Sequence, residues 1–138
     1  MSKRSFYVLI TSHDTLCQAY LNAARLILCE ELENVYTVAF SENMPTEYFQ
    51  EEVAKIVQTC QARPLLILSD VIGGTPNNIA MKYLMEKDIH LITGINLPLL
   101  LEVLLAQTSG VELATLNLKE LVSKAQSNLV YVNALIQC

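Results

Sequence analysis

Residues 64–78 read PLLILSDVIGGTPNN, and this stretch decides the fold that we expect for the chain. Its first part, LLIL, is a short continuous apolar run, which is typical of a parallel strand buried on both faces. Asp70 then places a carboxylate at the carboxyl end of that strand. Two glycines form a turn, and a helix start follows, with Thr75 as the N-cap and Pro76 at the first helical position. Ligands of open α/β sheets bind at this edge, so the stretch predicts a polar site there.

The rest of the chain alternates between strand and helix patterns. Short β-rich or apolar runs predict strands at 6–10, 35–40, 65–69 and 89–93. Apolar residues at helical spacing predict helices at 16–28, around the face formed by Phe49, Val53, Ile56 and Cys60, from Thr75 to Glu86, at 99–107 with Asn96 as cap, and at 118–125. One α/β domain over residues 1–138 follows, a three-layer sandwich with a mostly parallel sheet and helices on both faces.

A last β-rich run, 129–133, predicts one more strand. It has no crossover helix of its own, so we expect it at an edge of the sheet, antiparallel, or paired with the sheet of another subunit. The composition agrees with a partner surface, since 52% of the residues are hydrophobic and only 17% are charged. The simplest partner is a second copy of the chain.

Charge and cysteine content exclude several function classes. A net charge of −5 argues against nucleic acid, which needs a basic surface. No apolar stretch reaches the length that crosses a bilayer, about 20 residues. Cysteines 17, 29, 60 and 138 have no CxxC spacing. We interpret Cys17, Cys29, Cys60 and Cys138 as small buried hydrophobic residues in a reducing cytoplasm, and not as a metal site or disulfide framework.

Three predicted strands end in polar residues that would meet at one edge of the sheet. His13 follows the first strand, Asp70 the third, and Thr93 with Gly94 ends the fourth. If the first and third strands are neighbours, Asp70 can accept a hydrogen bond from one imidazole nitrogen and leave the other as a nucleophile. The helix start at Thr75 suits an anionic oxygen such as phosphate. The pattern predicts a phosphoryl-accepting histidine, and the alternative is a histidine that only caps the helix after the first strand.

Other reaction schemes fit the sequence less well. The chain lacks the Gly-Lys-Ser/Thr of a P-loop, the GxGxxG of a dinucleotide site, a serine nucleophile elbow and histidines at metal-ligand spacing. Asp70 alone could accept a phosphoryl group, as in a response-regulator receiver, but such a site needs an acidic pair after the first strand and a late lysine. His90 opens the fourth strand, so we expect it at the opposite end of the sheet in a structural or solvent-facing role.

Three segments give the chain a resemblance to a known family. They are THS at 11–13, SDVIGGTPNN at 69–78 and TGINLPLL at 93–100. With them the chain resembles the mannose-type enzyme IIA component of the bacterial sugar phosphotransferase system over nearly its whole length. The resemblance implies that His13 takes a phosphoryl group from the phosphocarrier protein HPr and passes it to a histidine of a IIB component. Asp70 would orient the ring, and Thr75 with Gly73 and Gly74 would hold the phosphate.

The same resemblance implies the partners of the chain. It implies a cytoplasmic homodimer that exchanges a C-terminal edge strand, an indirect association with membrane IIC and IID subunits, and no metal or organic cofactor. A related alternative is the phosphocarrier subunit of dihydroxyacetone kinase, although that group lacks the Gly-Gly-Thr-Pro turn. Another alternative is a regulatory module that does not relay phosphate.

One residue departs from the family pattern. The family usually has glycine directly after the histidine, and here that position is Asp14. A second carboxylate beside a phosphohistidine would repel the phosphate and favour a protonated ring, which is not nucleophilic. We therefore expect an active domain that is specialised or weakened relative to its family.

Overall fold

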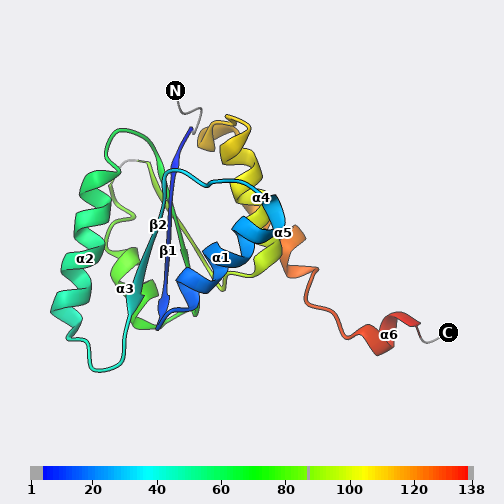
Figure 1. Ribbon diagram of the computed structural model, residues 1–138, viewed down its shortest axis with the longest axis horizontal. Coiled ribbons are helices and arrows are strands. Elements are labelled where there is room, and N and C mark those ends of the chain that lie inside the picture. Colours follow the sequence, from blue (N-terminus) through cyan, green and yellow to red (C-terminus); the bar gives the residue numbers. More distant parts are fainter. Residues whose placement is uncertain (1–4, 87, 137–138) are drawn as a thin grey trace.

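The computed structural model of the protein describes residues 5–86 and 88–136, and its centre is a sheet of four parallel strands (Figure 1). The strands lie in the order β2-β1-β3-β4. They are β1 (Tyr7–His13), β2 (Val35–Phe40), β3 (Leu65–Ser69) and β4 (Ile89–Thr93). The boundaries predicted for the last three strands are confirmed, whereas β1 continues to His13 itself. The three-layer α/β architecture is also confirmed.

Helices cover both faces of the sheet. On one face lie α2 (Thr46–Thr59) and α3 (Thr75–Met81), and on the other lie α1 (Leu16–Leu28), α4 (Leu97–Thr108) and α5 (Leu118–Gln126) (Figure 1). A short 3-10 turn, η1 (Leu113–Thr115), joins the last two. Successive residues of β1 point to opposite faces, so Val8 and Ile10 belong to one core cluster and Leu9 to the other. All three are fully buried.

The start of α4 matches its sequence signal. The Asn96 side chain accepts a hydrogen bond from the backbone N–H of Leu99 at 2.9 Å, which confirms the predicted cap. The same side chain donates to the Ala125 carbonyl at 2.8 Å, so it also holds the end of α5. The helix is apolar on most sides because it packs on the sheet, on α1 and on α5.

Helix α4 begins two residues earlier than predicted, at Leu97, and two details of α3 also differ from the predictions. The helix that begins near Thr75 ends at Met81 and not at Glu86, because residues 82–85 form turns and Glu86 a bend. The N-cap is Gly74, in extended conformation, and Thr75 is already helical. A turn with two glycines can place its second glycine in the cap position, and this moves the helix start back by one residue.

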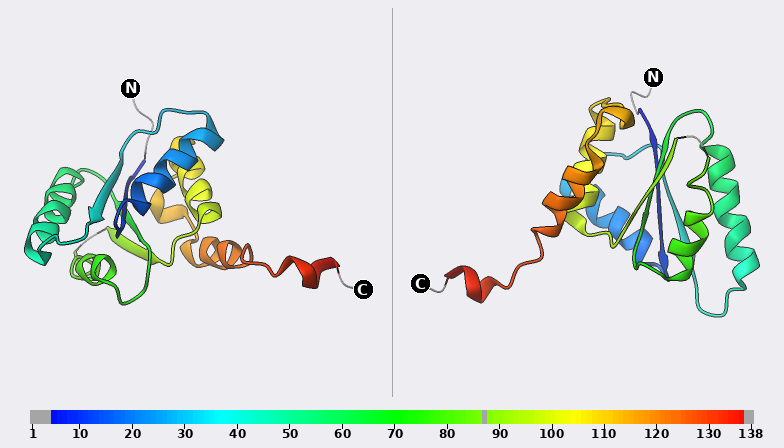
Figure 2. Two further views of the ribbon diagram at one scale, coloured as in Figure 1. Left: turned by 60° about the horizontal axis from the view of Figure 1, so that its bottom comes forward. Right: turned by 180° about the vertical axis from the view of Figure 1, so that it is seen from behind.

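The strand predicted at 129–133 is wrong for this structure. Residues 128–131 have no regular structure, and Val132–Ile136 forms a short helix, α6. We call residues 128–136 the tail; it leaves the end of α5 and extends away from the sheet (Figures 1 and 2). A strand needs the edge of another strand for its backbone hydrogen bonds, and the tail reaches none in the single chain.

The cysteine prediction is correct for two residues. Cys17 and Cys60 are buried, and burial raises the pKa of the Cys60 thiol to about 11. Cys29 is exposed, contrary to prediction, and is the residue with a left-handed backbone (φ 54°) that ends α1. Cys138 lies outside the described residues. Within the described ranges, no helix has both the length and the apolar character needed to cross a bilayer.

Gln107 connects α4 to the start of the sheet, and this generates a stability prediction. Its fully buried side chain donates from Nε2 to the carbonyls of Phe6, at 2.8 Å, and Asn34, at 3.3 Å. Gln107→Met keeps the length of the side chain but leaves a buried carbonyl without its donor. We expect the free energy of unfolding to fall by about 1–3 kcal/mol in urea denaturation. The exposed Gln126→Met is the control, and an equal effect of the two changes would contradict the role of Gln107.

Candidate functional site

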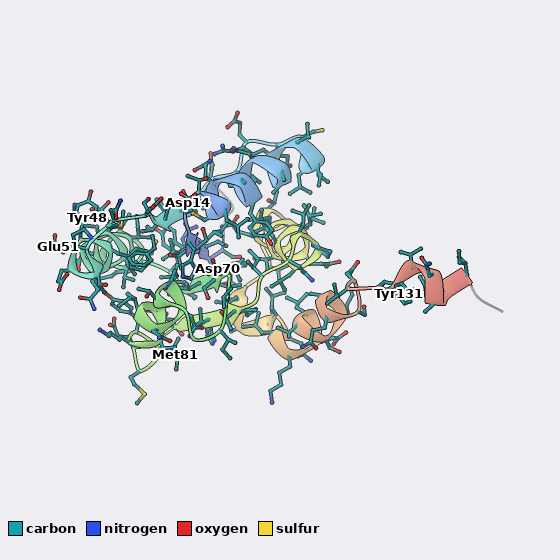
Figure 3. All side chains as sticks on the ribbon, turned by 90° about the horizontal axis from the view of Figure 1, so that it is seen from below. Asp14, Tyr48, Glu51, Asp70, Met81 and Tyr131 are labelled. Carbon is teal, nitrogen blue, oxygen red and sulfur yellow. The ribbon has the colours of Figure 1, made fainter. Side chains whose placement is uncertain are left out.

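The pairing of β1 with β3 brings His13 and Asp70 together. The two strands are parallel, with Thr11 opposite Ser69, so His13 and Asp70 both lie at the carboxyl edge of the sheet. The backbone N–H of His13 donates to Asp70 Oδ2 at 2.8 Å. Nδ1 of its ring lies 2.9 Å from the same oxygen. Figure 3, seen from below, shows Asp70 near the centre of this edge and Asp14 at the start of α1.

The state of the Asp70 carboxylate determines which nitrogen of His13 is available. Burial raises the pKa of Asp70, since only 6% of its side chain is exposed, but the hydrogen bonds from the backbone and ring of His13 outweigh burial and hold this pKa below its usual value. An ionised carboxylate can only accept hydrogen bonds, so the proton of a neutral ring resides on Nδ1. Nε2 then has the free lone pair. The imidazole is half-exposed, at 49% of its side chain.

The Gly73–Gly74 turn lies against the imidazole. A Cβ atom built on Gly74 would lie 2.7 Å from Cε1 of His13 and 3.5 Å from Nε2, so only glycine lets the ring approach this closely. Gly73 has a φ of +82°, which also favours glycine. The Asn78 side chain fixes the turn by donating to the Gly73 carbonyl at 3.1 Å. Thr75 follows directly as the first residue of α3.

The end of β4 supports Asp70 from the neighbouring strand. The hydroxyls of Ser69 and Thr93 are 2.6 Å apart, and the Ser69 carbonyl accepts hydrogen bonds from the N–H groups of Gly94, at 3.0 Å, and Ile95, at 3.1 Å. These contacts fix the residue immediately before Asp70. Thr93 and Gly94 therefore lie at the predicted edge, where they contact Ser69 and so support the backbone that carries the Asp70 carboxylate.

Asp14 occupies a backbone conformation that favours glycine. Its φ is +52°, in the left-handed region where a side chain is disfavoured, although aspartate tolerates it better than most residues. The conformation is held from both sides. The Asp14 N–H donates to the Phe40 carbonyl at 2.9 Å, and the Ser12 hydroxyl donates to the Asp14 carbonyl at 3.0 Å. The residue is exposed, and its conformation explains why a glycine would suit the position.

Sequence reasoning missed two aromatic residues near the pair. The ring of Phe40 meets the His13 ring edge-on, with 6.1 Å between centroids. The Tyr20 hydroxyl donates to the Ile95 carbonyl at 3.1 Å, and burial, followed by the charge of Asp70, raises the pKa of Tyr20. Phe40 could have been found because it ends β2, the other neighbour of β1.

His90 lies near the start of β4, exposed and away from this edge, as predicted.

Among residues 5–86 and 88–136, no three His, Cys, Asp or Glu side chains are grouped so that they could hold a metal ion.

Comparison with known proteins gives a consistent result. The family model described as "PTS system fructose IIA component" matches residues 7–126. The chain is 32% identical over 105 residues to the PTS system mannose-specific EIIAB component of Escherichia coli (strain K12), a match that covers 72% of this chain and 31% of that protein. The chain thus spans about a third of that relative's length. It is 31% identical over 99 residues to the PTS system fructose-specific EIIA component of Bacillus subtilis (strain 168), covering 70% and 67%.

Solved structures show the same similarity in three dimensions. The PTS IIA protein associated with the fucose utilization operon of Streptococcus pneumoniae superposes with a TM-score of 0.87 at 26% identity, covering 99% of this chain and all of that one. The mannose/sorbose-specific IIA subunit of Enterococcus faecalis gives a TM-score of 0.79 at 25% identity, covering 94% of each chain.

The lowered pKa of Asp70 predicts a pH dependence of stability. A carboxyl group with a pKa lower in the folded than in the unfolded chain stabilises the fold above the unfolded pKa, about 3.9, and this contribution is lost as the pH falls through the folded pKa. We expect the difference in unfolding free energy between the wild type and Asp70→Asn to shrink between pH 5 and pH 2.5. Urea denaturation at each pH measures it, and a constant difference would contradict the assignment.

Proposed function

Because the chain belongs to the mannose-type IIA family of the bacterial sugar phosphotransferase system, we propose that it accepts a phosphoryl group from phospho-HPr on His13 and passes it to a IIB component. The observation that supports this most strongly is the bond between Nδ1 of His13 and Asp70, which leaves Nε2 as the nucleophile on a half-exposed ring. Val71 and Ile72 on the adjoining loop are exposed and apolar, as suits contact with a protein donor.

The proposed reaction is an in-line transfer between two imidazoles. The lone pair of His13 Nε2 attacks phosphorus, the P–N bond of the donor histidine breaks, and its electron pair returns to the donor ring. The His13 ring keeps its Nδ1 proton and gains positive charge, which the carboxylate of Asp70 offsets at 2.9 Å. Transfer to the IIB histidine repeats the step in the opposite direction.

The loop beside the ring is the proposed phosphate cradle. Gly74 lies against Cε1 and near Nε2, so a phosphoryl group on Nε2 would lie close to the turn formed by Gly73, Gly74 and Thr75. The Thr75 hydroxyl and the backbone N–H groups of this turn are the proposed donors to the phosphate oxygens. No metal or organic cofactor takes part in the proposed step. In the cytoplasm, the IIB partner would link the chain to membrane IIC and IID subunits.

Asp14 favours a second candidate function, a regulatory module that takes up phosphate without relaying it. A carboxylate next to the acceptor would repel the incoming phosphoryl group and favour a protonated ring, which is a poor partner for a relay. The two functions differ in the last step, because only the relay returns phosphate to a IIB component.

The site of phosphorylation is directly testable. The protein is incubated with phosphoenolpyruvate, enzyme I and HPr, and the mass of the intact chain is measured. We expect one phosphoryl group on the wild type and on His90→Ala, and none on His13→Ala. Asp70→Asn should be labelled more slowly, since an amide cannot offset the charge that develops on the ring.

The chemistry of the bond gives an independent control. A phosphohistidine is a phosphoramidate, labile in acid and stable in base, whereas an aspartyl phosphate is destroyed by base. A base-labile label, or a label that survives in His13→Ala, would overturn the proposed mechanism.

If the Asp14 carboxylate slows phosphoryl acceptance, a variant that lacks this charge should accept the group faster. Asp14→Gly removes a negative charge near the incoming phosphate, and it suits the left-handed backbone. We expect rapid-quench measurements to show phosphoryl acceptance from HPr roughly two- to fivefold faster, because an exposed charge of this kind costs about 0.5–1 kcal/mol. Asp14→Asn keeps a residue that tolerates this backbone and should show the same gain. Equal or lower rates in both variants would show that the carboxylate is no handicap.

We also propose a homodimer in which the tail of each chain covers the β4 edge of the other. Large apolar side chains of the tail are exposed, among them Leu129 (91%), Tyr131 (71%) and Ile136 (75%). A groove of about 350 Å³ runs beside β4, lined by His90, Leu91, Ile92, Leu118, Lys119 and Val122. The β4 edge exposes unpaired backbone groups and the tail exposes apolar side chains, and contact between the two would remove both from water.

Removing the tail tests this arrangement. A chain that ends at Ser127 should elute as monomers or aggregates in size-exclusion chromatography with light scattering, whereas the full chain should be a dimer. Leu129→Asp in the full chain should weaken the dimer, because it places a charge in the proposed interface. The matched control is Leu26→Asp, on an exposed position of α1. An unchanged dimer after truncation would refute the proposal.

A further inference from the structure

The imidazole of His13 has contacts on three sides. Asp70 holds Nδ1, and Gly74 lies against Cε1. The third contact is the ring of Phe40, at an interplanar angle of 70° and a centroid distance of 6.1 Å. This distance and angle are typical of an attractive edge-to-face pair of rings.

Phe40 is itself held by the core of the domain. It is the last residue of β2 and pairs with His13 across the sheet. Its carbonyl accepts the hydrogen bond from the N–H of Asp14, which fixes the backbone at this point. Its ring stacks edge-to-face on Phe49 of α2, with 5.1 Å between centroids, and Phe49 is fully buried. The orientation of the Phe40 ring is thus set by packed secondary structure and not by a loop.

The contact with Phe40 restrains a motion that the Asp70 bond leaves open. A hydrogen bond at Nδ1 fixes one atom of the imidazole, but the ring can still tilt about that atom, and tilting moves Nε2 sideways. An aromatic ring against a second side of the imidazole limits the tilt. We propose that Phe40 is a positioning residue that fixes the plane of the His13 ring, so that Nε2 points at the incoming phosphorus. The value of this restraint for transfer rests on the proposed function.

The experiment compares Phe40→Leu with Tyr36→Leu in the full chain. Both residues are half-buried aromatics on β2, and Tyr36 contacts Tyr7 and not the histidine. The first measurement is NMR relaxation of the His13 ring in the unphosphorylated protein. We expect a lower order parameter, together with a less uniform Nδ1–H tautomer, in Phe40→Leu but not in Tyr36→Leu.

The second measurement is phosphoryl acceptance from phospho-HPr. We expect the saturating rate of Phe40→Leu to fall about tenfold with a KM within twofold of the wild type, because a misaligned nucleophile loses transition-state interactions and not donor binding. Phe40→Met should show the same loss of rate as Phe40→Leu. It is the variant to measure if Phe40→Leu does not fold. A ring order parameter equal to that of the wild type, or a loss shared with Tyr36→Leu, would overturn the assignment. An unlabelled wild type would instead refute the proposed function, and the ring order would still show whether Phe40 restrains His13.

Discussion

The parallel pairing of β1 with β3 is the constraint on which the site depends. The register places Thr11 opposite Ser69, so His13, two residues further on, and Asp70, one residue further on, meet at one oxygen of the carboxylate. A slip of one residue would turn His13 to the other face of the sheet, and a slip of two would move it by about 7 Å. The register is fixed in turn by the apolar residues at 8–10 and 65–68, which are buried between the two helical layers. The packing of the core therefore also determines the distance between His13 and Asp70.

Much of this arrangement could be predicted because it depends on local patterns and common topology. The strands β2, β3 and β4 begin and end where apolar runs meet turn residues, so their boundaries were predicted correctly. The Asn96 cap has a short-range signature as well. The approach of His13 to Asp70 required only that the first and third strands be neighbours, which is the usual order in small doubly wound sheets.

The remaining features depend on contacts that no local pattern encodes. Residues 129–133 have the composition of a strand, but composition cannot tell which edge, if any, a segment pairs with. The contact between Phe40 and the imidazole follows from the register of two strands separated by a helix. The left-handed backbone at Asp14 is imposed by hydrogen bonds from its surroundings, against the preference of the side chain. These are tertiary effects that override local propensity.

The half-exposed imidazole of His13 has a consequence for how long the proposed intermediate would last. A ring that two different proteins must reach in turn cannot be enclosed, and the same opening admits water to the P–N bond. The turn at Gly74 shields only one side of the ring. The residence time of the phosphoryl group would then be set by how soon the second protein arrives and not by protection within the fold. Under the proposed function His13 would hold each phosphoryl group only briefly, and the phosphorylated fraction would follow the rate at which the donor supplies the group and the acceptor removes it.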